Sequence, residues 1–370
     1  MTRLLIALVI LAGCARPRPA APAPAARAYL DAAIDSLRAV ALTRDSVDWS
    51  SVRAEAMRRA AGARAPHETW EAVRFLLRSL GDHHSFLQLP DSLAALEAAH
   101  RVGADGTGPG GAAIPTDPVP PDPPSPSPFG VRMQPLFEMV RVGETRIALV
   151  SMPQGRRDDA FAASFQDGVA SLARERPCGW IVDLRGNGGG DMWPMLAGLG
   201  PLLGEGAGGG SVAADGTRSA WIYRSGAAIY RDSGGREHRY ARVEPPRPTL
   251  TPPPPVAVLH DRGTASSGEA LTVAFRGRPG TRSFGERTWG ASTATRGVRL
   301  PDGANMVVAV EVFVDRAGAR YPNGVDPDEA LPAADAMLPV RDDPAVARAA
   351  SWLVGRSACT DPASLDGDPA

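Results

Sequence analysis

The stretch GWIVDLRGNGGG, residues 179–190, decides the fold. Residues 179–184 form a short apolar run, as in a strand that is buried on both faces. The run leads into RGNGGG (185–190), where consecutive glycines let the backbone approach a bound group closely and expose its N–H groups. This loop lacks the Lys-Ser/Thr ending of a P-loop and the glycine spacing of a dinucleotide fingerprint. It predicts either a donor loop for a developing negative charge or a simple glycine-rich turn.

Strand and helix patterns alternate around this segment. Residues 146–152 predict a strand, and Phe161, Phe165, Val169 and Leu172 have the spacing of one apolar helix face. The other expected elements are strands near 221–224 and 227–231 within a loop-rich region 195–250, a strand at 256–259, a helix at 269–275 and a long strand at 305–314. Such alternation indicates an α/β fold.

The sequence before this core predicts helices. Leu30, Ile34 and Leu37 recur at helical spacing, and so do Trp70, Val73, Leu77 and Leu80. The expected organisation is a small helical subdomain at 28–100, a Gly/Pro-rich linker at 101–128, a core at 129–340 and a C-terminal tail at 341–370 with a short helix around 346–354.

The N-terminus predicts an exported protein. Arg3 precedes an apolar run at 4–12 that is too short to span a bilayer as a helix, so residues 1–13 read as a signal peptide. Small residues lead to Cys14, as in a bacterial lipobox; an ordinary signal peptide with a chance cysteine is the alternative. We expect Cys14 to be lipidated and followed by a Pro/Ala-rich tether at 14–27. Because Ala15, not Asp, follows the cysteine, we expect the lipid to anchor the protein in the outer membrane, with the domain facing the periplasm.

Charge and cysteine content give no sign of a nucleic-acid partner or of a cysteine-based metal site. The 370 residues include 40 basic and 41 acidic ones, and every basic residue is Arg. This balance gives no reason to expect a nucleic-acid partner. Cys178 and Cys359 remain after Cys14, and the sequence leaves open whether they pair and which oligomeric state the chain has. No cysteine pattern typical of a metal site is present.

The run TASSGE (264–269) follows the strand at 256–259 and opens the helix at 269–275. A serine there gains from the free N–H groups and positive partial charge of a helix N-terminus. Ser266 is therefore a candidate nucleophile, and the N–H of Ser267 a candidate oxyanion donor. Taken alone, such a run is more often an N-cap than a nucleophile.

The run GDHHS (81–85) ends the helix around Trp70. A histidine takes a serine proton near neutral pH, so this run offers a base. A solvent-facing helix end is the plainer alternative. We expect no metal, because adjacent histidines point apart and no further ligands stand at suitable spacing.

Together these runs resemble peptidase family S41, which includes the C-terminal processing (tail-specific) proteases, the tricorn core protease and retinoid-binding-protein-like members. DLRGNGGG, TASSGE with FGERTWG (284–290), and GVDPD (324–328) carry the resemblance in the family's order. It implies a crotonase/ClpP-like α/β core preceded by the helical subdomain.

The resemblance also implies catalytic roles. In the processing-protease branch a Lys activates the serine, but Ala291 stands at that position and the chain has no Lys. In the tricorn-like branch a His from a D-x-H-S/T motif serves, which is His84 here. We therefore expect Ser266 as nucleophile, His84 as base, and the backbone N–H groups of Ser267, Gly188 and Gly189 as oxyanion donors.

One position departs from the family pattern. The carboxylate that orients the His is expected three residues before GVDPD, where this chain has Tyr321. The sequence leaves open whether another carboxylate takes this role; the candidates are Glu311, Asp315, Asp326 and Asp328.

The function expected from this reading is that of a serine endopeptidase working through an acyl-enzyme without a cofactor. Its partners are a peptide or protein substrate and, through the lipid anchor, a membrane. A non-catalytic ligand- or peptide-binding protein on the same fold is the alternative. An esterase is a third reading, although the Gly-x-Ser-x-Gly elbow is absent around Ser266. The linker at 101–128 stands where many relatives insert a PDZ domain.

Overall fold

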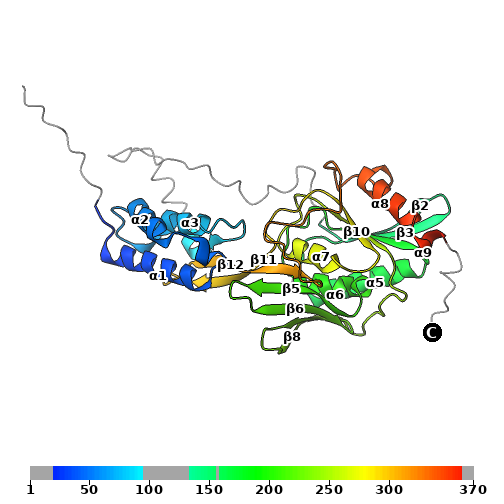
Figure 1. The fold of residues 1–370 in the computed structure, drawn as a ribbon, viewed down its shortest axis with the longest axis horizontal. Helices are drawn as coiled ribbons and strands as arrows, with labels where there is room; N and C mark the ends of the chain where they lie inside the picture. The colour runs from blue at the N-terminus through cyan, green and yellow to red at the C-terminus, as the bar shows by residue number, and fades with distance from the viewer. Residues whose placement is uncertain (1–19, 95–132, 156–157, 361–370) are drawn as a thin grey trace, which may run out of the picture.

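The computed structural model describes residues 20–94, 133–155 and 158–360 (Figure 1). The predicted signal segment 1–13, Cys14 and the linker 101–128 lie outside the described residues. The last four residues of the predicted tether are helical, because helix α1 (Pro24–Val40) begins at a proline, a residue favoured in the first turn of a helix. No helix in the described ranges has the length and apolar character needed to cross a membrane.

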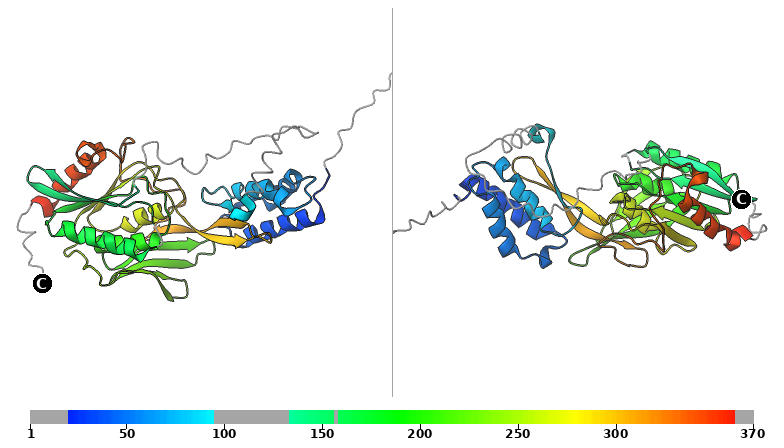
Figure 2. Two further views of the ribbon diagram at one scale, coloured as in Figure 1. Left: turned by 180° about the vertical axis from the view of Figure 1, so that it is seen from behind. Right: turned by 90° about the horizontal axis from the view of Figure 1, so that it is seen from above.

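The N-terminal part consists of helices packed on a short strand (Figures 1 and 2). Its helices after α1 are α2 (Trp49–Arg59) and α3 (Trp70–Arg78), with 3₁₀ turns at Arg44–Ser46 and Pro66–Thr69. Strand β1 (Phe86–Gln88) follows. The predicted apolar positions Leu30, Ile34 and Leu37 are all buried. They pack in one cluster with Met306 and Val308 from the late strand β12 (Asn305–Asp315).

The core contains a mostly parallel sheet with the order β13–β10–β9–β4–β3–β2. Its strands in that order are Glu329–Ala330, Thr281–Gly285, Val256–His260, Gly179–Asp183, Thr145–Ser151 and Leu136–Val142. β2 runs antiparallel to β3, and the other neighbours are parallel. The parallel order places the carboxyl ends of β4 and β9 side by side, with Asp183 opposite Leu259.

A second sheet is antiparallel and has the order β1–β12–β5–β6–β7–β8, with β11 also paired to β12. The strands not yet given are β5 (Gly206–Ala213), β6 (Arg218–Arg224), β7 (Ala227–Arg231), β8 (Glu237–Arg242) and β11 (Thr293–Arg299). β12 pairs with β1 near its start and with β5 near its end. This strand therefore joins the helical part to the core, as Figure 1 shows.

Helices fill the space between the two sheets. These are α5 (Asp159–Ala173), α6 (Met192–Leu203) and α7 (Ser267–Phe275), and the main hydrophobic cluster takes residues from both sheets and from all of them. α8 (Pro344–Val354) covers the other face of the parallel sheet, and a 3₁₀ turn (Val340–Asp342) and α9 (Ser357–Thr360) flank it. A disulfide joins Cys178, just before β4, to Cys359 in α9. The predicted α/β core with preceding helices is confirmed.

The expectation of a loop-rich region at 195–250 is wrong. Much of it belongs to α6 and to β5–β8, well beyond the two expected strands. β5 has the sequence GAGGGSVA, which has little intrinsic strand propensity. It forms a strand because both of its edges are paired, to β12 and to β6. Tertiary pairing here overrides local preference.

Candidate active site

Ser266 lies on the turn between β9 and α7 and is the N-cap residue of that helix. Its backbone has φ 51° and ψ −115°, a left-handed conformation that is strained for a residue with a side chain. Strain of this kind persists only where the surroundings enforce it, and it gathers at functional sites. The predicted serine is thus held half-buried at the start of a helix, in a conformation that the local sequence alone does not favour.

The carboxylate of Glu269 holds this turn. Its Oε2 accepts the N–H of Ser266 at 2.8 Å, while Oε1 accepts the Thr288 hydroxyl at 2.6 Å and the Gly290 N–H at 2.8 Å. Glu269 is fully buried, and burial raises its pKa although these hydrogen bonds act against the rise. The carboxylate therefore ties the serine turn to the segment 288–290.

The glycine-rich loop lies directly against the serine. A Cβ on Gly189, which has φ +113°, would come within 2.9 Å of the Ser266 Cβ and 3.2 Å of the Ser267 nitrogen. The Asn187 carbonyl accepts the N–H of Ala265 at 2.9 Å, and the Ser267 hydroxyl donates to the Gly190 carbonyl at 2.6 Å. The structure thus brings the two predicted motifs, DLRGNGGG and TASSGE, into contact.

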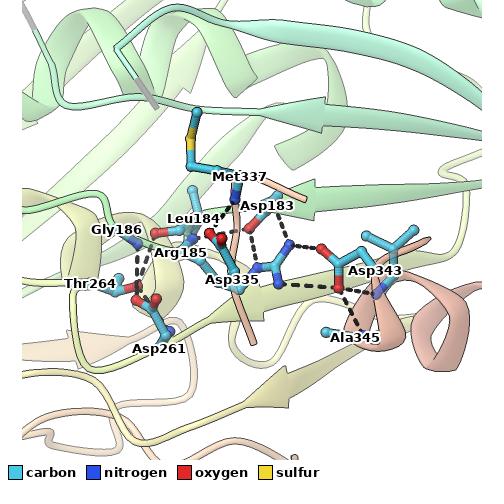
Figure 3. A network of polar contacts seen from close by, with 11 residues as sticks. Asp183, Leu184, Arg185, Gly186, Asp261, Thr264, Asp335, Met337, Asp343 and Ala345 are labelled. Atoms are coloured by element: carbon cyan, nitrogen blue, oxygen red, sulfur yellow. Dashed lines mark hydrogen bonds and ion pairs between the residues drawn. The ribbon is translucent and has the colours of Figure 1, made fainter. Parts of the chain in front are cut away.

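Figure 3 shows how the rest of DLRGNGGG is anchored. The buried guanidinium of Arg185 donates to Asp183 (Nε–Oδ1 2.9 Å, Nη2–Oδ2 2.8 Å) and to Asp343 (Nη2–Oδ2 2.6 Å). Asp343 also caps α8 by accepting the N–H of Ala345 at 2.9 Å. The ion pairs therefore connect the loop to α8, a link that no sequence pattern predicts.

A second carboxylate, that of Asp261, connects the same loop to the serine turn. Its Oδ1 accepts the N–H of Gly186 at 2.9 Å, the N–H of Gly263 at 2.9 Å and the hydroxyl of Thr264 at 3.2 Å. Thr264 Oγ1, which has one proton to share between the two acceptors, also lies 2.9 Å from the Leu184 carbonyl oxygen. Burial raises the pKa of Asp261, and these donors counter the rise. The two loops at the carboxyl ends of β4 and β9 are thus fastened to each other.

The predicted oxyanion donors differ in their surroundings. The N–H of Gly189 donates to Asn187 Oδ1 at 3.0 Å. Ser267 is the first residue of α7, where a backbone N–H has no partner inside the helix. In the described part of the chain, no hydrogen bond uses the N–H of Gly188 or of Ser267. These two groups are therefore free to receive a ligand oxygen.

His84 lies on the loop between α3 and β1. Asp82 shapes this loop, because its Oδ1 accepts the N–H of His84 at 2.9 Å and of Ser85 at 2.6 Å. The Ser85 hydroxyl donates to Asp82 Oδ2 at 2.8 Å and accepts the N–H of Ala309, on β12, at 2.9 Å. The histidine is thus fixed to β12 through its neighbours.

The imidazole of His84 contacts Thr293, the first residue of β11, with 2.8 Å between Nδ1 and Oγ1. Burial lowers the pKa of His84, while the charge of Asp82 and a hydrogen bond with the Thr293 backbone act in the opposite direction. Sequence reasoning missed Thr293. A strand threonine 209 residues away carries no signal that distinguishes it from any other.

The carboxylates that the sequence offered for His84 are bonded elsewhere. Asp315 accepts the hydroxyl of Tyr321 at 2.8 Å, so the tyrosine at the expected glutamate position is itself bonded to one of these carboxylates. The partners of the other three are Ser211 for Glu311, Arg287 for Asp326, and Ser283 with Arg276 for Asp328. Ala291, at the position of the family's Lys, is buried.

The residue next to His84 lies close to a segment that shares an anchor with Ser266. Adjacent His83 lies 3.7 Å, through its Cδ2, from the Cβ position of Gly290, and Gly290 shares Glu269 with Ser266. Within the described residues no hydrogen bond joins His84 to Ser266 directly. Catalytic hydrogen bonds are often long before a substrate binds. The same described ranges contain no group of His, Cys, Asp and Glu able to hold a metal ion.

Comparison with known proteins accounts for this arrangement. The sequence profile of peptidase family S41 matches residues 146–331, half of the chain. The chain belongs to peptidase family S41. This family member is 24% identical over 314 residues to the nisin-resistance protein of Lactococcus lactis subsp. lactis, covering 82% of this chain and 83% of that protein. It is also 28% identical over 170 residues to the chloroplastic C-terminal processing peptidase of Tetradesmus obliquus, covering 46% of this chain and 32% of that one.

Solved structures share its fold. A lipoprotein from Streptococcus agalactiae superposes with a TM-score of 0.59 at 21% identity, covering 90% of this chain and 97% of that one. The photosystem II D1 C-terminal processing protease gives a TM-score of 0.51 at 18% identity, covering 90% and 98%. The S41 member therefore has the mixed α/β peptidase fold with N-terminal helices.

Proposed function

We propose that this S41 family member is a serine peptidase in which Ser266 is the nucleophile and His84 the general base. The observation that carries the proposal is the strained backbone of Ser266 at the N-terminus of α7, with Gly189 packed against its side chain. A structural N-cap needs no such strain, because capping residues ordinarily adopt extended backbone angles. Membership of a peptidase family supports the same reading.

The proposed reaction assigns these groups the steps of acyl-enzyme catalysis. Ser266 Oγ attacks the scissile carbonyl carbon, and His84 Nε2 takes the hydroxyl proton and later gives it to the leaving amine. The developing oxyanion accepts from the N–H groups of Ser267 and Gly188; loss of one such donor typically costs about 3 kcal/mol. Gly189, whose N–H is occupied by Asn187, supports the proposal chiefly by leaving room for Ser266. Water then releases the acyl group.

We further propose that the peptidase acts in the cell envelope. The lipobox ending at Cys14 predicts a lipid anchor, which would hold the enzyme on the outer membrane facing the periplasm. A structural neighbour described as a lipoprotein is consistent with this location. Substrates are peptides or proteins. Because one relative is named for resistance to nisin, that compound belongs in the first substrate panel.

A fluorophosphonate probe tests the nucleophile. The full lipidated chain in detergent should become labelled and should cleave a peptide library, and Ser266→Ala should abolish both. Ser267→Ala is the matched variant, because it removes the adjacent hydroxyl and its bond to Gly190 but keeps the backbone N–H. It should still be labelled, at a reduced rate.

Comparing variants of the two neighbouring histidines tests which of them is the base. His84→Ala should lower peptide cleavage at least about 100-fold, the usual contribution of general base catalysis, while His83→Ala should lower it much less. Equal labelling of wild type and Ser266→Ala would overturn the proposal. An unlabelled wild type that binds peptides would identify the chain as a binding protein, and cleavage of esters alone would identify an esterase.

A further inference from the structure

The partner of the His84 imidazole is a hydroxyl. Thr293 Oγ1 lies 2.8 Å from Nδ1, and the threonine is only 4% exposed. A threonine hydroxyl accepts a proton in a hydrogen bond without carrying charge. If Nδ1 carries the ring proton, Nε2 is left as the unprotonated nitrogen. The contact leaves Nε2 as the basic nitrogen when Thr293 Oγ1 accepts the Nδ1 proton.

The frame around Thr293 is rigid. Its N–H donates to the Ala291 carbonyl at 2.8 Å, and the preceding Ser292 carbonyl accepts the Phe313 N–H at 3.0 Å. Thr293 stands opposite Val312 on β12, the strand that also binds the His84 loop through Ser85. Both sides of the imidazole contact are thus attached to one strand, so their separation is fixed by the sheet and not by a mobile loop.

Charged groups around the imidazole are few in the described structure. Asp82, on the same loop, is the carboxylate whose charge acts on His84. Its oxygens accept the N–H groups of His84 and Ser85 and the Ser85 hydroxyl, so it shapes the loop and does not touch the ring. From the packed strands, Glu311 and Asp315 are bonded to Ser211 and Tyr321.

We infer that Thr293 is the positioning residue of this peptidase, holding Nδ1 of His84 protonated so that Nε2 faces Ser266. The inference rests on the proposed function. In the reaction the Ser266 proton moves to Nε2 and then to the leaving amine, and the Nδ1 proton stays on the ring while Thr293 neither gains nor loses one. A neutral hydroxyl orients the imidazole without stabilising its charge as a carboxylate would.

Variants at one atom test this role in the full chain. Thr293→Val keeps the shape and removes the hydroxyl, and it should lower kcat about 10- to 100-fold with little change in KM, the scale expected for one buried hydrogen bond. Thr293→Ser restores the hydroxyl and should recover most of the rate. Thr295→Val, on the exposed side of the same strand, is the matched control and should behave as wild type.

The pH dependence separates positioning from mere packing. Thr293→Asp places a carboxylate beside the imidazole, so the acid limb of kcat/KM should move to higher pH; Thr295→Asp should move it far less. A wild-type kcat in Thr293→Val would overturn the inference. So would acid limbs of kcat/KM that lie at the same pH in the two Asp variants. If Thr293→Asp does not fold, the Val and Ser variants decide alone. An inactive wild type would instead overturn the peptidase proposal itself.

Discussion

The side chain of Glu269 binds the main chain of Ser266, with 2.8 Å between Oε2 and the serine nitrogen. Glu269 lies in the first turn of the helix and binds the N-cap residue three positions before it. Its other oxygen, Oε1, accepts hydrogen bonds from Thr288 and Gly290. The same carboxylate therefore fixes the angle of the proposed nucleophile and the wall beside it. Two loops that belong to different strands share one anchor.

Glu269→Gln should damage both stability and activity. The amide keeps one acceptor oxygen and turns the other position into a donor, which then faces an N–H or hydroxyl group. We expect a loss of about 1–3 kcal/mol in the free energy of unfolding, measured by urea denaturation, and at least tenfold slower labelling. Glu71→Gln, on an exposed surface pair with Arg78, should change neither. Wild-type labelling of Glu269→Gln would contradict the anchor role.

Gly189→Ala should remove activity while leaving most of the fold intact. The added methyl group would lie 2.9 Å from the Ser266 Cβ at a backbone φ of +113°, so the serine or the loop must shift. A displacement of about 1 Å at the reacting atoms costs about 100-fold in rate. At Gly188 a Cβ meets nothing within 4 Å, so Gly188→Ala should lose far less. Acylation rates of the two variants, compared at equal thermal stability, check this difference.

Arg185→Met should destabilise the fold strongly. The change leaves Asp183 and Asp343 buried without their cation, and breaking such a buried pair typically costs 3–5 kcal/mol. Arg262→Met is the control, because Arg262 is 82% exposed and its pair with Glu286 lies at the surface. Chemical denaturation should separate the two variants clearly. Equal midpoints would mean that the ion pairs shown in Figure 3 contribute nothing to stability.

His260 should make the fold sensitive to acid. It is fully buried, its Nδ1 donates to the Glu286 carbonyl at 2.7 Å, and burial lowers its pKa to about 4. Its ordinary pKa is about 6.5, so below that pH the unfolded chain binds a proton that the folded chain refuses. Stability should therefore fall as the pH drops from about 6.5 to about 4, by roughly 3 kcal/mol for this group.

His260→Asn tests that slope. Asparagine keeps a donor near the Glu286 carbonyl but does not titrate, so the pH dependence between about 6.5 and 4 should flatten even if the variant is less stable at neutral pH. Urea denaturation at several pH values measures the slope directly. Parallel curves for wild type and variant would show that His260 is not the acid-sensitive group.

Local pattern predicted the site's two central loops well. β4 with its glycine run and the helix that starts behind Ser266 depend on residues close together in sequence, so period and glycine content were enough. The partner of His84 could not be predicted from the sequence. Tyr321 occupies the position where a carboxylate was expected, and the observed partner is the hydroxyl of a residue more than 200 positions away. β5 was not predicted for a different reason: its own sequence disfavours a strand, and pairing with its two neighbours imposes one.

β12 carries a consequence for how the protein is made. Met306 and Val308 pack in the core of the N-terminal helices. The N–H of Ala309 binds Ser85 on the His84 loop, and Phe313 packs in the core between the sheets. A ribosome therefore releases the helices and His84 long before the strand that both depend on. A nascent chain that stops at residue 290 contains both Ser266 and His84 but lacks Thr293 and all of β12. The proposed activity thus depends on a strand that is made late in synthesis, and fragments ending before β12 should be inert.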